Sequence, residues 1–189
     1  MTTVDSPVDS PAVGGTAQSL RQLYFLRFAF ALVWAGTLFA TGGQLGPLGI
    51  ALIVLYPLFD VAAAVVDVRA SRATELPYGL YLNIAISLAA AVGMAIAGTS
   101  GVPAVLLVWG AWAVISGLVQ LAVGVARRRM GGQWPMILSG GISVFAGSGF
   151  ALGSGAPDAS LSNVAGYAVL GGIFFLISAL RLRRTSQER

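Results

Sequence analysis

Six long apolar runs, separated by short segments rich in Gly, Pro or Arg, decide what this chain can fold into. A transmembrane α-helix needs about 20 apolar residues to cross the hydrocarbon core of a bilayer, and each run is about that long. Only 10% of the 189 residues are charged, too few to cover the surface of a water-soluble protein. The sequence therefore predicts an all-α membrane protein with six transmembrane helices, at residues 23–40, 48–68, 78–97, 104–126, 134–152 and 164–182.

The segments before and after these runs are short. Residues 1–18 are rich in small polar residues, Pro and Gly and show no apolar period, so we expect a disordered tail. Residues 185–189 form a second polar tail, and residues 19–184 form one transmembrane domain. No basic residue precedes Arg21, and a second apolar run follows the first directly. This pattern argues against a cleaved signal peptide.

The basic residues all fall on one side of the predicted membrane topology. All eleven are Arg: Arg21, Arg27, Arg69, Arg72, Arg127, Arg128, Arg129, Arg181, Arg183, Arg184 and Arg189. The three loops on the other side contain a single charged residue, Asp158. Because Arg and Lys are enriched in cytoplasmic loops, we expect the Arg-bearing side and both termini to lie in the cytoplasm.

The chain also divides into three helical hairpins, each of which ends at an Arg-bearing boundary. The second helix of each hairpin carries small or polar residues about two to three turns before that boundary. These are Asp60, then Ser116 and Gly117, then Gly171 and Gly172. Small residues let helix backbones approach closely, and close packing drives much of helix association in lipid. In the alternative, a chain with 25 Gly shows such a pattern by chance.

The fifth run has small residues at helical spacing. Ser143 and Gly147 lie four residues apart, as do Gly149 and Gly153, so the members of each pair share one face of a helix; Gly140 is a further small residue about one turn before Ser143. The pattern predicts close packing of this helix, either within the chain's own bundle or against a second copy of the chain in a homo-oligomer.

Three segments are similar to a known family. They are Trp112–Gln120 and Gly132–Gly147, on either side of an Arg cluster, and Gly172–Arg181. Together they resemble the HdeD-like membrane proteins, whose short repeat is called domain of unknown function 308. The resemblance extends over residues 20–184. It implies a six-helix protein of a bacterial inner membrane, a role in acid stress, and no catalytic residue to carry over.

The first hairpin departs from that family at Asp60 and Asp67, where apolar or small residues are usual. Asp60 lies about 14 Å from Arg69 at 1.5 Å per residue, near the middle of the bilayer. A carboxylate at that depth is costly and commonly marks a proton or ion path. Pro57, one turn earlier, removes a backbone donor and leaves the carbonyl of Ile53 without its helical partner.

Arg27 is the candidate partner of Asp60. It lies inside the first run, at a depth that differs from that of Asp60 by about 6 Å, which a guanidinium can bridge. We therefore expect an Arg27–Asp60 ion pair. In the alternative, Arg27 extends to the cytoplasmic interface, and Asp60 is protonated or has a structural hydrogen bond. Asp67 is expected to be a boundary charge that balances Arg69 or Arg72.

Asn83 and Gln120 are the uncharged amides inside the predicted helices, each about two turns from the Arg-bearing side. Amides at such positions can hydrogen-bond across helices, which stabilises their association by about 0.6–2 kcal/mol. We expect structural contacts from both residues, and we include them with Asp60 and Arg27 in a candidate intramembrane polar site.

The chain lacks the groups that most enzymes use. His, Cys and Lys are absent, which excludes imidazole catalysis, thiolate nucleophiles, zinc or iron–sulfur sites and Schiff bases. The sequence shows no nucleophile paired with a base and no Gly-rich phosphate loop. We therefore expect no enzymatic activity, no cofactor and no metal. Arg127–Arg129 is expected to contact anionic lipid headgroups at the bilayer surface rather than nucleic acid.

Three functions remain open. The resemblance implies a non-enzymatic role in acid or membrane stress. Asp60 and Arg27 are also compatible with a small transporter or a proton-responsive channel. Gly-rich helix faces would suit a membrane scaffold that binds a partner protein. Replacing Asp60 by Asn is expected to abolish flux through a transporter, whereas a bulky residue at Gly147 is expected to release the partner of a scaffold.

Overall fold

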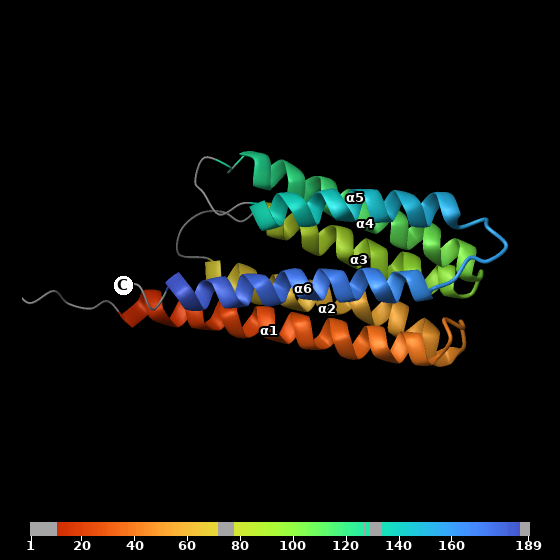
Figure 1. Cartoon of the computed structure of the whole chain (residues 1–189), viewed down its shortest axis with the longest axis horizontal. Helices are drawn as coiled ribbons and strands as arrows, with labels where there is room; N and C mark the ends of the chain where they lie inside the picture. The colour runs from red at the N-terminus through yellow and green to blue at the C-terminus, as the bar shows by residue number, and fades with distance from the viewer. Residues whose placement is uncertain (1–10, 72–77, 127, 129–133, 186–189) are drawn as a thin grey trace, which may run out of the picture.

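The computed structural model describes residues 11–71, 78–126, 128 and 134–185. These residues form six α-helices and no strand (Figure 1). The helices are α1 (Pro11–Ala40), α2 (Pro47–Ser71), α3 (Tyr78–Gly98), α4 (Val102–Ala126), α5 (Trp134–Gly153) and α6 (Ser162–Thr185). Each contains a segment long and apolar enough to cross a bilayer. The predicted all-α fold with six transmembrane helices is therefore confirmed for the described part of the chain.

Helices that follow each other in the chain run in opposite directions, so α1, α3 and α5 begin at the same end of the bundle (Figure 1). We call this the Arg-bearing end; the described residues Arg21, Arg69, Arg128 and Arg181 lie toward it. Arg72, Arg127, Arg129 and Arg189 lie outside the described residues. The cytoplasmic location predicted for this end therefore still depends on the charge pattern of the sequence.

The first helix begins earlier than expected. Residues 11–18 were expected in a disordered tail, but they are helical and continue into the apolar run of α1. Residues 16–22 contain neither Gly nor Pro, so a helix formed by the apolar run can extend backwards through them. Pro11 suits the first turn of a helix, where its missing N–H needs no partner. Residues 1–10 and 186–189, also predicted as tails, lie outside the described residues.

At the opposite end of the bundle, two tight turns depend on glycine. Gly42 and Gly43, which connect α1 to α2, have φ angles of 64° and 68°. Gly101, which connects α3 to α4, has a φ of 101°. Residues with a Cβ rarely adopt such positive φ angles, so glycine at these positions allows short connections between antiparallel helices.

The six helices contact one another in a ring. The most extensive interfaces join α4 to α5, α1 to α6, and α2 to α3. Each joins the second helix of one hairpin to the first helix of the next, and α6 closes the ring onto α1. Within the hairpins, α1–α2 and α5–α6 share much smaller interfaces. The three hairpins predicted from the sequence are therefore not the main units of packing, because a short loop keeps two helices adjacent without deciding which faces meet.

The repeat seen in the sequence corresponds to these three interfaces. Asp60 of α2 contacts α3 through hydrogen bonds. Gly117 of α4 faces the backbone of α5, and Gly172 of α6 faces Ala31 and Phe28 of α1. The sequence pattern groups Gly171 with Gly172, but a Cβ added at Gly171 would meet no atom within 4 Å. The small or polar position in each hairpin thus makes its contact with the following hairpin.

The tightest contact in the bundle is the α4–α5 seam, formed by Gly110 and Gly117 of α4 with Gly140 and Gly147 of α5. A Cβ on Gly117 would lie 2.7 Å from the carbonyl oxygen of Gly140, and a Cβ on Gly147 would lie 2.7 Å from that of Gly110. Backbone atoms cannot move aside cheaply, so all four positions require glycine. Within the described chain, the close packing predicted for Gly140 and Gly147 is therefore made with α4. The same prediction is wrong for Gly149 and Gly153, where a Cβ would meet no atom of the described residues within 4 Å.

Two serines singled out in the sequence lie near this seam and differ in their contacts. Ser143 is buried, and its Oγ accepts a hydrogen bond of 2.8 Å from the hydroxyl of Tyr167 on α6. The Oγ of Ser116 is buried without a hydrogen-bond partner among the described residues. Ser143 therefore links α5 to α6, whereas Ser116 contributes a small side chain.

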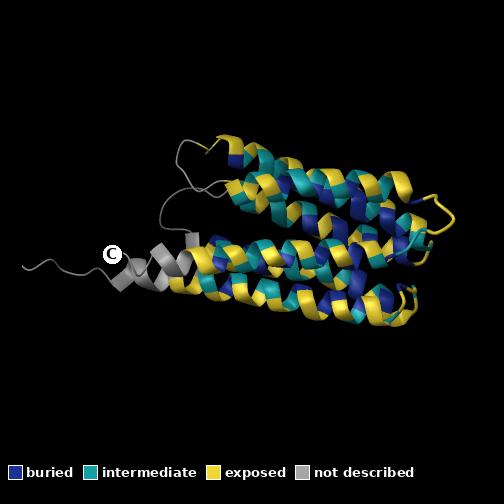
Figure 2. Cartoon of the chain, viewed as in Figure 1, coloured by how far each residue is buried: buried dark blue, intermediate teal, exposed yellow. Residues whose placement is uncertain are grey.

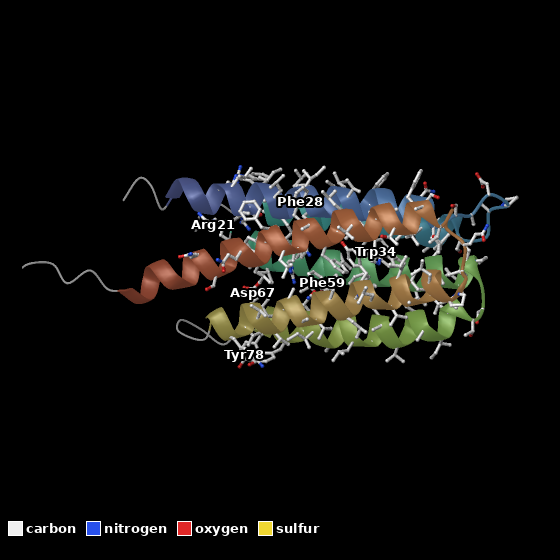
Figure 3. All side chains as sticks on the ribbon, turned by 90° about the horizontal axis from the view of Figure 1, so that it is seen from below. Arg21, Phe28, Trp34, Phe59, Asp67 and Tyr78 are labelled. Atoms are coloured by element: carbon white, nitrogen blue, oxygen red, sulfur yellow. The ribbon has the colours of Figure 1, made fainter. Side chains whose placement is uncertain are left out.

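Large aromatic side chains fill the interior between α1, α2 and α4. Trp34 and Trp109 are buried and stack with ring centroids 5.4 Å apart, and Tyr56 contacts both. Figure 3 shows Trp34 farther along the bundle than Arg21 and Asp67, which lie toward the Arg-bearing end. Exposed residues recur along every helix (Figure 2), as expected for side chains that face lipid.

Candidate functional site

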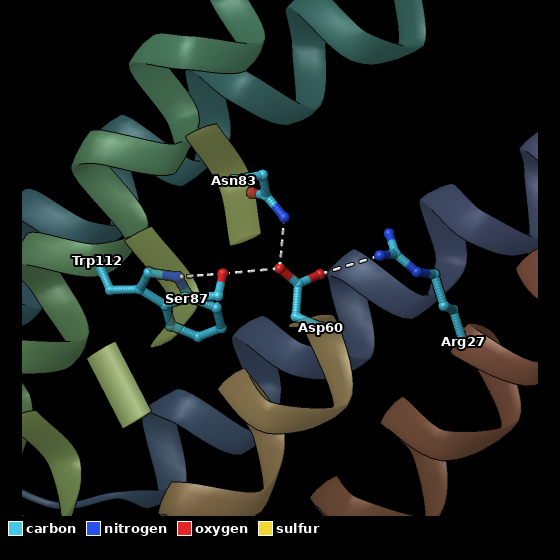
Figure 4. A network of polar contacts seen from close by, with 5 residues as sticks. All are labelled: Arg27, Asp60, Asn83, Ser87 and Trp112. Carbon is cyan, nitrogen blue, oxygen red and sulfur yellow. Dashed lines mark hydrogen bonds and ion pairs between the residues drawn. The ribbon is translucent and has the colours of Figure 1, made fainter. Parts of the chain in front are cut away.

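A network of polar side chains surrounds Asp60 of α2 (Figure 4). Arg27 of α1 donates from Nη2 to Asp60 Oδ1 at 3.1 Å. Asn83 Nδ2 and Ser87 Oγ of α3 donate to Asp60 Oδ2 at 2.7 and 2.9 Å. Trp112 Nε1 of α4 donates to Ser87 Oγ at 3.2 Å. We call these five residues the Asp60 hub, which joins four helices.

The helix geometry explains how the hub assembles. Asn83 and Ser87 lie four residues apart, so both project from the same face of α3 onto α2. A serine hydroxyl has one donor and two acceptor lone pairs. Ser87 can therefore donate to Asp60 while it accepts from Trp112, and it transmits the contact from α2 to α4.

Hydrogen-bond donors and one cation surround the carboxyl group of Asp60. The side chains of Arg27 and Asp60 are 12% and 22% exposed, respectively, so both charges are largely removed from the surface of the protein. An ionised carboxylate only accepts hydrogen bonds, and three donors supply both oxygens of Asp60. Pairing with Arg27 offsets part of the large desolvation cost of placing either charge among apolar helices.

Arg27 has two further neighbours. Its guanidinium carbon lies 4.8 Å from the centroid of the Phe175 ring on α6, a distance that allows a cation–π interaction. Its Nε is buried without a partner among the described residues. The side chain is therefore held by α2 on one side and α6 on the other, and its Nε donor is left unused by the described part of the chain.

A small cavity lies beside the ion pair. It has a volume of about 20 Å³ and is lined by Arg27, Asp60 and four aromatic side chains: Phe30, Tyr56, Phe59 and Phe175. A volume of this size is enough for about one water molecule. The cavity therefore provides space for a proton carrier next to the carboxylate, but not for a larger solute.

The structure brings together three of the four residues of the candidate polar site. Arg27, Asp60 and Asn83 meet, whereas Gln120 of α4 is half-buried and makes no hydrogen bond to Asn83. Asn83 is directed to Asp60 because a carboxylate is a stronger acceptor than an amide. Among the described residues, Asp67 forms no ion pair with Arg69. Arg72, its other expected partner, lies outside them.

Sequence reasoning missed Ser87 and Trp112. The spacing of Ser87 from Asn83 was a usable signal, since residues four apart share a helix face. Trp112 belongs to another helix, and no local pattern connects it to Asp60. One turn before Pro57, Trp34 Nε1 donates at 2.7 Å to the carbonyl of Leu52, the residue before Ile53.

No protein-family model, curated protein or solved structure matches this chain. The resemblance to the HdeD-like proteins thus gains no support from these comparisons. The described residues also contain no group of three or more acidic, His or Cys side chains that could hold a metal ion.

Proposed function

We propose that this chain is a non-enzymatic membrane protein in which protonation of Asp60 changes the packing of the surrounding helices. The observation that supports this proposal most is the convergence of three donors on one intramembrane carboxylate. Asp60 accepts hydrogen bonds from Arg27, Asn83 and Ser87 at 2.7–3.1 Å. A proton that binds Asp60 removes the charge that pairs with Arg27 and weakens the hydrogen bonds from Asn83 and Ser87.

The consequence of protonation falls mainly on Arg27. With Asp60 neutral, the guanidinium would be an unpaired charge among apolar helices, which is strongly unfavourable. Arg27 lies within reach of the Arg-bearing end, and a long Arg side chain can extend to an interface. We propose that α1 and α2 then separate locally, which their small shared interface favours. Acidity would in this way be converted into a change of helix packing.

A proton pathway through Asp60 is the second candidate function. It is supported by the intramembrane acid and by the adjacent cavity, which has room for about one water molecule. The same small volume favours a proton over any larger solute as the transported species.

The third function considered, a scaffold that binds a partner through Gly-rich faces, has less support. The glycines of the α4–α5 seam, including Gly147, face backbone atoms of the same chain. A bulky residue at Gly147 is therefore expected to disturb the bundle itself before it disturbs any partner.

Acid response also agrees with the role implied by the resemblance to HdeD-like proteins. In this proposal the protein lies in a bacterial inner membrane with both termini in the cytoplasm, as the distribution of Arg indicates. Asp60 would then respond to acidity from within the bilayer.

The proposal is tested by reconstituting the wild type, Asp60→Asn and Asp67→Asn in liposomes. Asn is neutral and has nearly the shape of protonated Asp, and Asp67→Asn is the matched control on the same helix. Tryptophan emission and thermal stability are recorded between about pH 4 and pH 8, together with proton flux. We expect a reversible change of emission in the wild type and in Asp67→Asn, and none in Asp60→Asn.

The outcomes separate the candidate functions. Proton flux that is lost only in Asp60→Asn would favour the pathway over the sensor. An emission spectrum and stability that do not vary with pH in the wild type, together with an absence of proton flux, would overturn both and would leave Asp60 as a structural residue.

A further inference from the structure

A second feature of the bundle is unrelated to Asp60: an apolar groove between α5 and α6. It has a volume of about 590 Å³, within the range of small-molecule sites. Residues from both helices line it, among them Trp134, Gly141 and Phe145 of α5 and Phe174, Ile177 and Arg181 of α6. Phe174, Ile177 and Arg181 lie in the half of α6 nearer the Arg-bearing end. Trp134 and Gly141 lie in the corresponding half of α5, and Phe145 lies just past its middle.

The groove exists because α5 and α6 are drawn to different neighbours. The α4–α5 seam holds α5 against α4, and α6 packs mainly on α1. The two helices share the smallest interface in the ring. Near the opposite end, Tyr167 donates to Ser143 and its ring contacts that of Phe150 at 5.7 Å. The helices therefore meet there and leave an opening toward the Arg-bearing end.

The chemistry of the groove is polarised along the membrane normal. Its walls are almost entirely apolar, and Arg181, near the end of α6, is the one charged side chain among the residues that line it. Trp134, at the start of α5, is 77% exposed. Trp side chains are enriched at the level of lipid headgroups, so Trp134 and Arg181 together indicate that this end of the groove reaches the interface.

We propose that the groove binds one anionic phospholipid, with an acyl chain along the apolar wall and the phosphate at Arg181. The positive charge of Arg181 is complementary to an anionic headgroup, and the apolar walls suit an acyl chain. Leu138 and Phe145, which line the groove, are 56% and 84% exposed, so the groove is open on the lipid-facing side of the bundle and a lipid can enter it from the bilayer. The lipid site lies apart from the Asp60 hub and does not depend on the function proposed for that hub.

Two glycines on α5 offer a matched test of the acyl-chain site. A Cβ at Gly141, inside the groove, or at Gly149, outside it, would meet no atom within 4 Å. Leu is therefore tolerated at both positions, but only Gly141→Leu fills the groove. The protein is reconstituted with equal amounts of phosphatidylglycerol and phosphatidylethanolamine, extracted gently, and weighed by native mass spectrometry. We expect bound phosphatidylglycerol on the wild type and on Gly149→Leu, and a large loss on Gly141→Leu.

Substitution of Arg181 tests the headgroup. Loss of one positive charge near a membrane surface is expected to weaken the preference for phosphatidylglycerol over phosphatidylethanolamine about fivefold in Arg181→Gln. Arg181→Lys keeps the charge and is expected to keep most of the preference. Thermal stability, recorded for each variant, identifies any loss of binding that follows from unfolding.

Three results would overturn the proposal. The first is equal phosphatidylglycerol on Gly141→Leu and Gly149→Leu. The second is an unchanged preference in folded Arg181→Gln. The third is displacement of the bound lipid by inorganic phosphate alone, which would indicate a site for a free anion without a role for the acyl chain.

Discussion

The Asp60 hub and the α4–α5 seam hold the same bundle together by different means. The hub joins α1, α2, α3 and α4 through charge and hydrogen bonds, with donor–acceptor distances of 2.7–3.2 Å. The seam joins α4 to α5 through glycines, whose lack of a side chain lets the two backbones touch. A Cβ on Gly110 or Gly147 would collide with the opposite backbone.

This difference determines how each region can respond to its surroundings. The seam consists of van der Waals contacts between backbones, which neither pH nor a ligand alters directly. The hub contains one titratable carboxylate whose charge supports several contacts at once. In the function proposed above, the bundle combines an interface that pH does not alter with one that a single proton weakens. The most extensive helix–helix interface, α4–α5, is the one that pH does not alter.

The contrast is tested most strongly by Asp60→Ala. The change leaves Arg27 without a counter-ion and two donors of α3 without an acceptor, so the free energy of unfolding should fall by about 3–5 kcal/mol. Denaturation with sodium dodecyl sulfate in mixed micelles measures the change, with Asp67→Ala as the control. Arg27→Met combined with Asp60→Leu should recover much of the loss. Equal effects of Asp60→Ala and Asp67→Ala would contradict the hub.

Gly147→Leu should produce the next largest effect. Its side chain would meet the carbonyl oxygen of Gly110 and force α4 and α5 apart, at a cost of about 1–3 kcal/mol or more. Gly149→Leu, on the same helix with open space around it, should be nearly neutral. The loss at Gly147 should be the same at acidic and neutral pH, because the seam carries no titratable group. A loss that varies with pH would break the distinction between the two regions.

Ser87→Ala should have a moderate effect, because it removes one donor to Asp60 and the acceptor for Trp112. Hydrogen bonds between transmembrane helices contribute about 0.6–1.7 kcal/mol each, and the expected loss lies in that range. Ser148→Ala is the matched control, since the hydroxyl of Ser148 donates to the carbonyl of Val144 in its own helix and, among the described residues, has no hydrogen bond to another helix. Thermal unfolding measures the loss of stability in each of the two variants. A larger loss at Ser148 would show that Ser87 is no part of the network.

The smallest effect is expected for Gln120→Ala. Gln120 has no hydrogen bond to the hub, so its loss should change stability by less than about 0.5 kcal/mol. Asn83→Ala should cost more, because Asn83 donates to Asp60 at 2.7 Å. Measuring both by thermal unfolding separates the amide that belongs to the hub from the one that does not. Comparable losses of stability in the two variants would indicate that Gln120 belongs to the polar site.

Much of the fold could be predicted from local features. Apolar runs of about 20 residues define transmembrane helices regardless of tertiary contacts, since the bilayer requires an internally hydrogen-bonded backbone. The expected span at 134–152 is found as α5, Trp134–Gly153. The start of α1 at Pro11 was missed, because Pro11, Gly14 and Gly15 are typical of an irregular tail, and composition alone does not reveal that the helix of the apolar run continues backwards through them.

The candidate site was predictable only where depth decides the pairing. Arg27 and Asp60 lie at similar depths in adjacent helices, and opposite charges in an apolar medium attract strongly. Asn83 and Gln120 also lie at similar depths, but the rotation of each helix about its axis places one amide at Asp60 and leaves the other outside the hub. Rotation depends on side-chain packing over a whole interface, which no single residue reveals.

The sequence by itself thus determined that the chain spans a bilayer six times, and where its rare charges lie along the membrane normal. Hydrophobicity and the rise per residue of a helix are local properties, so both can be derived from the linear sequence. Only the tertiary structure decided which helices meet, that glycine holds α4 to α5, and that α5 and α6 open into a groove. Those outcomes depend on how six helical surfaces fit together at once, which is a property of the assembled bundle.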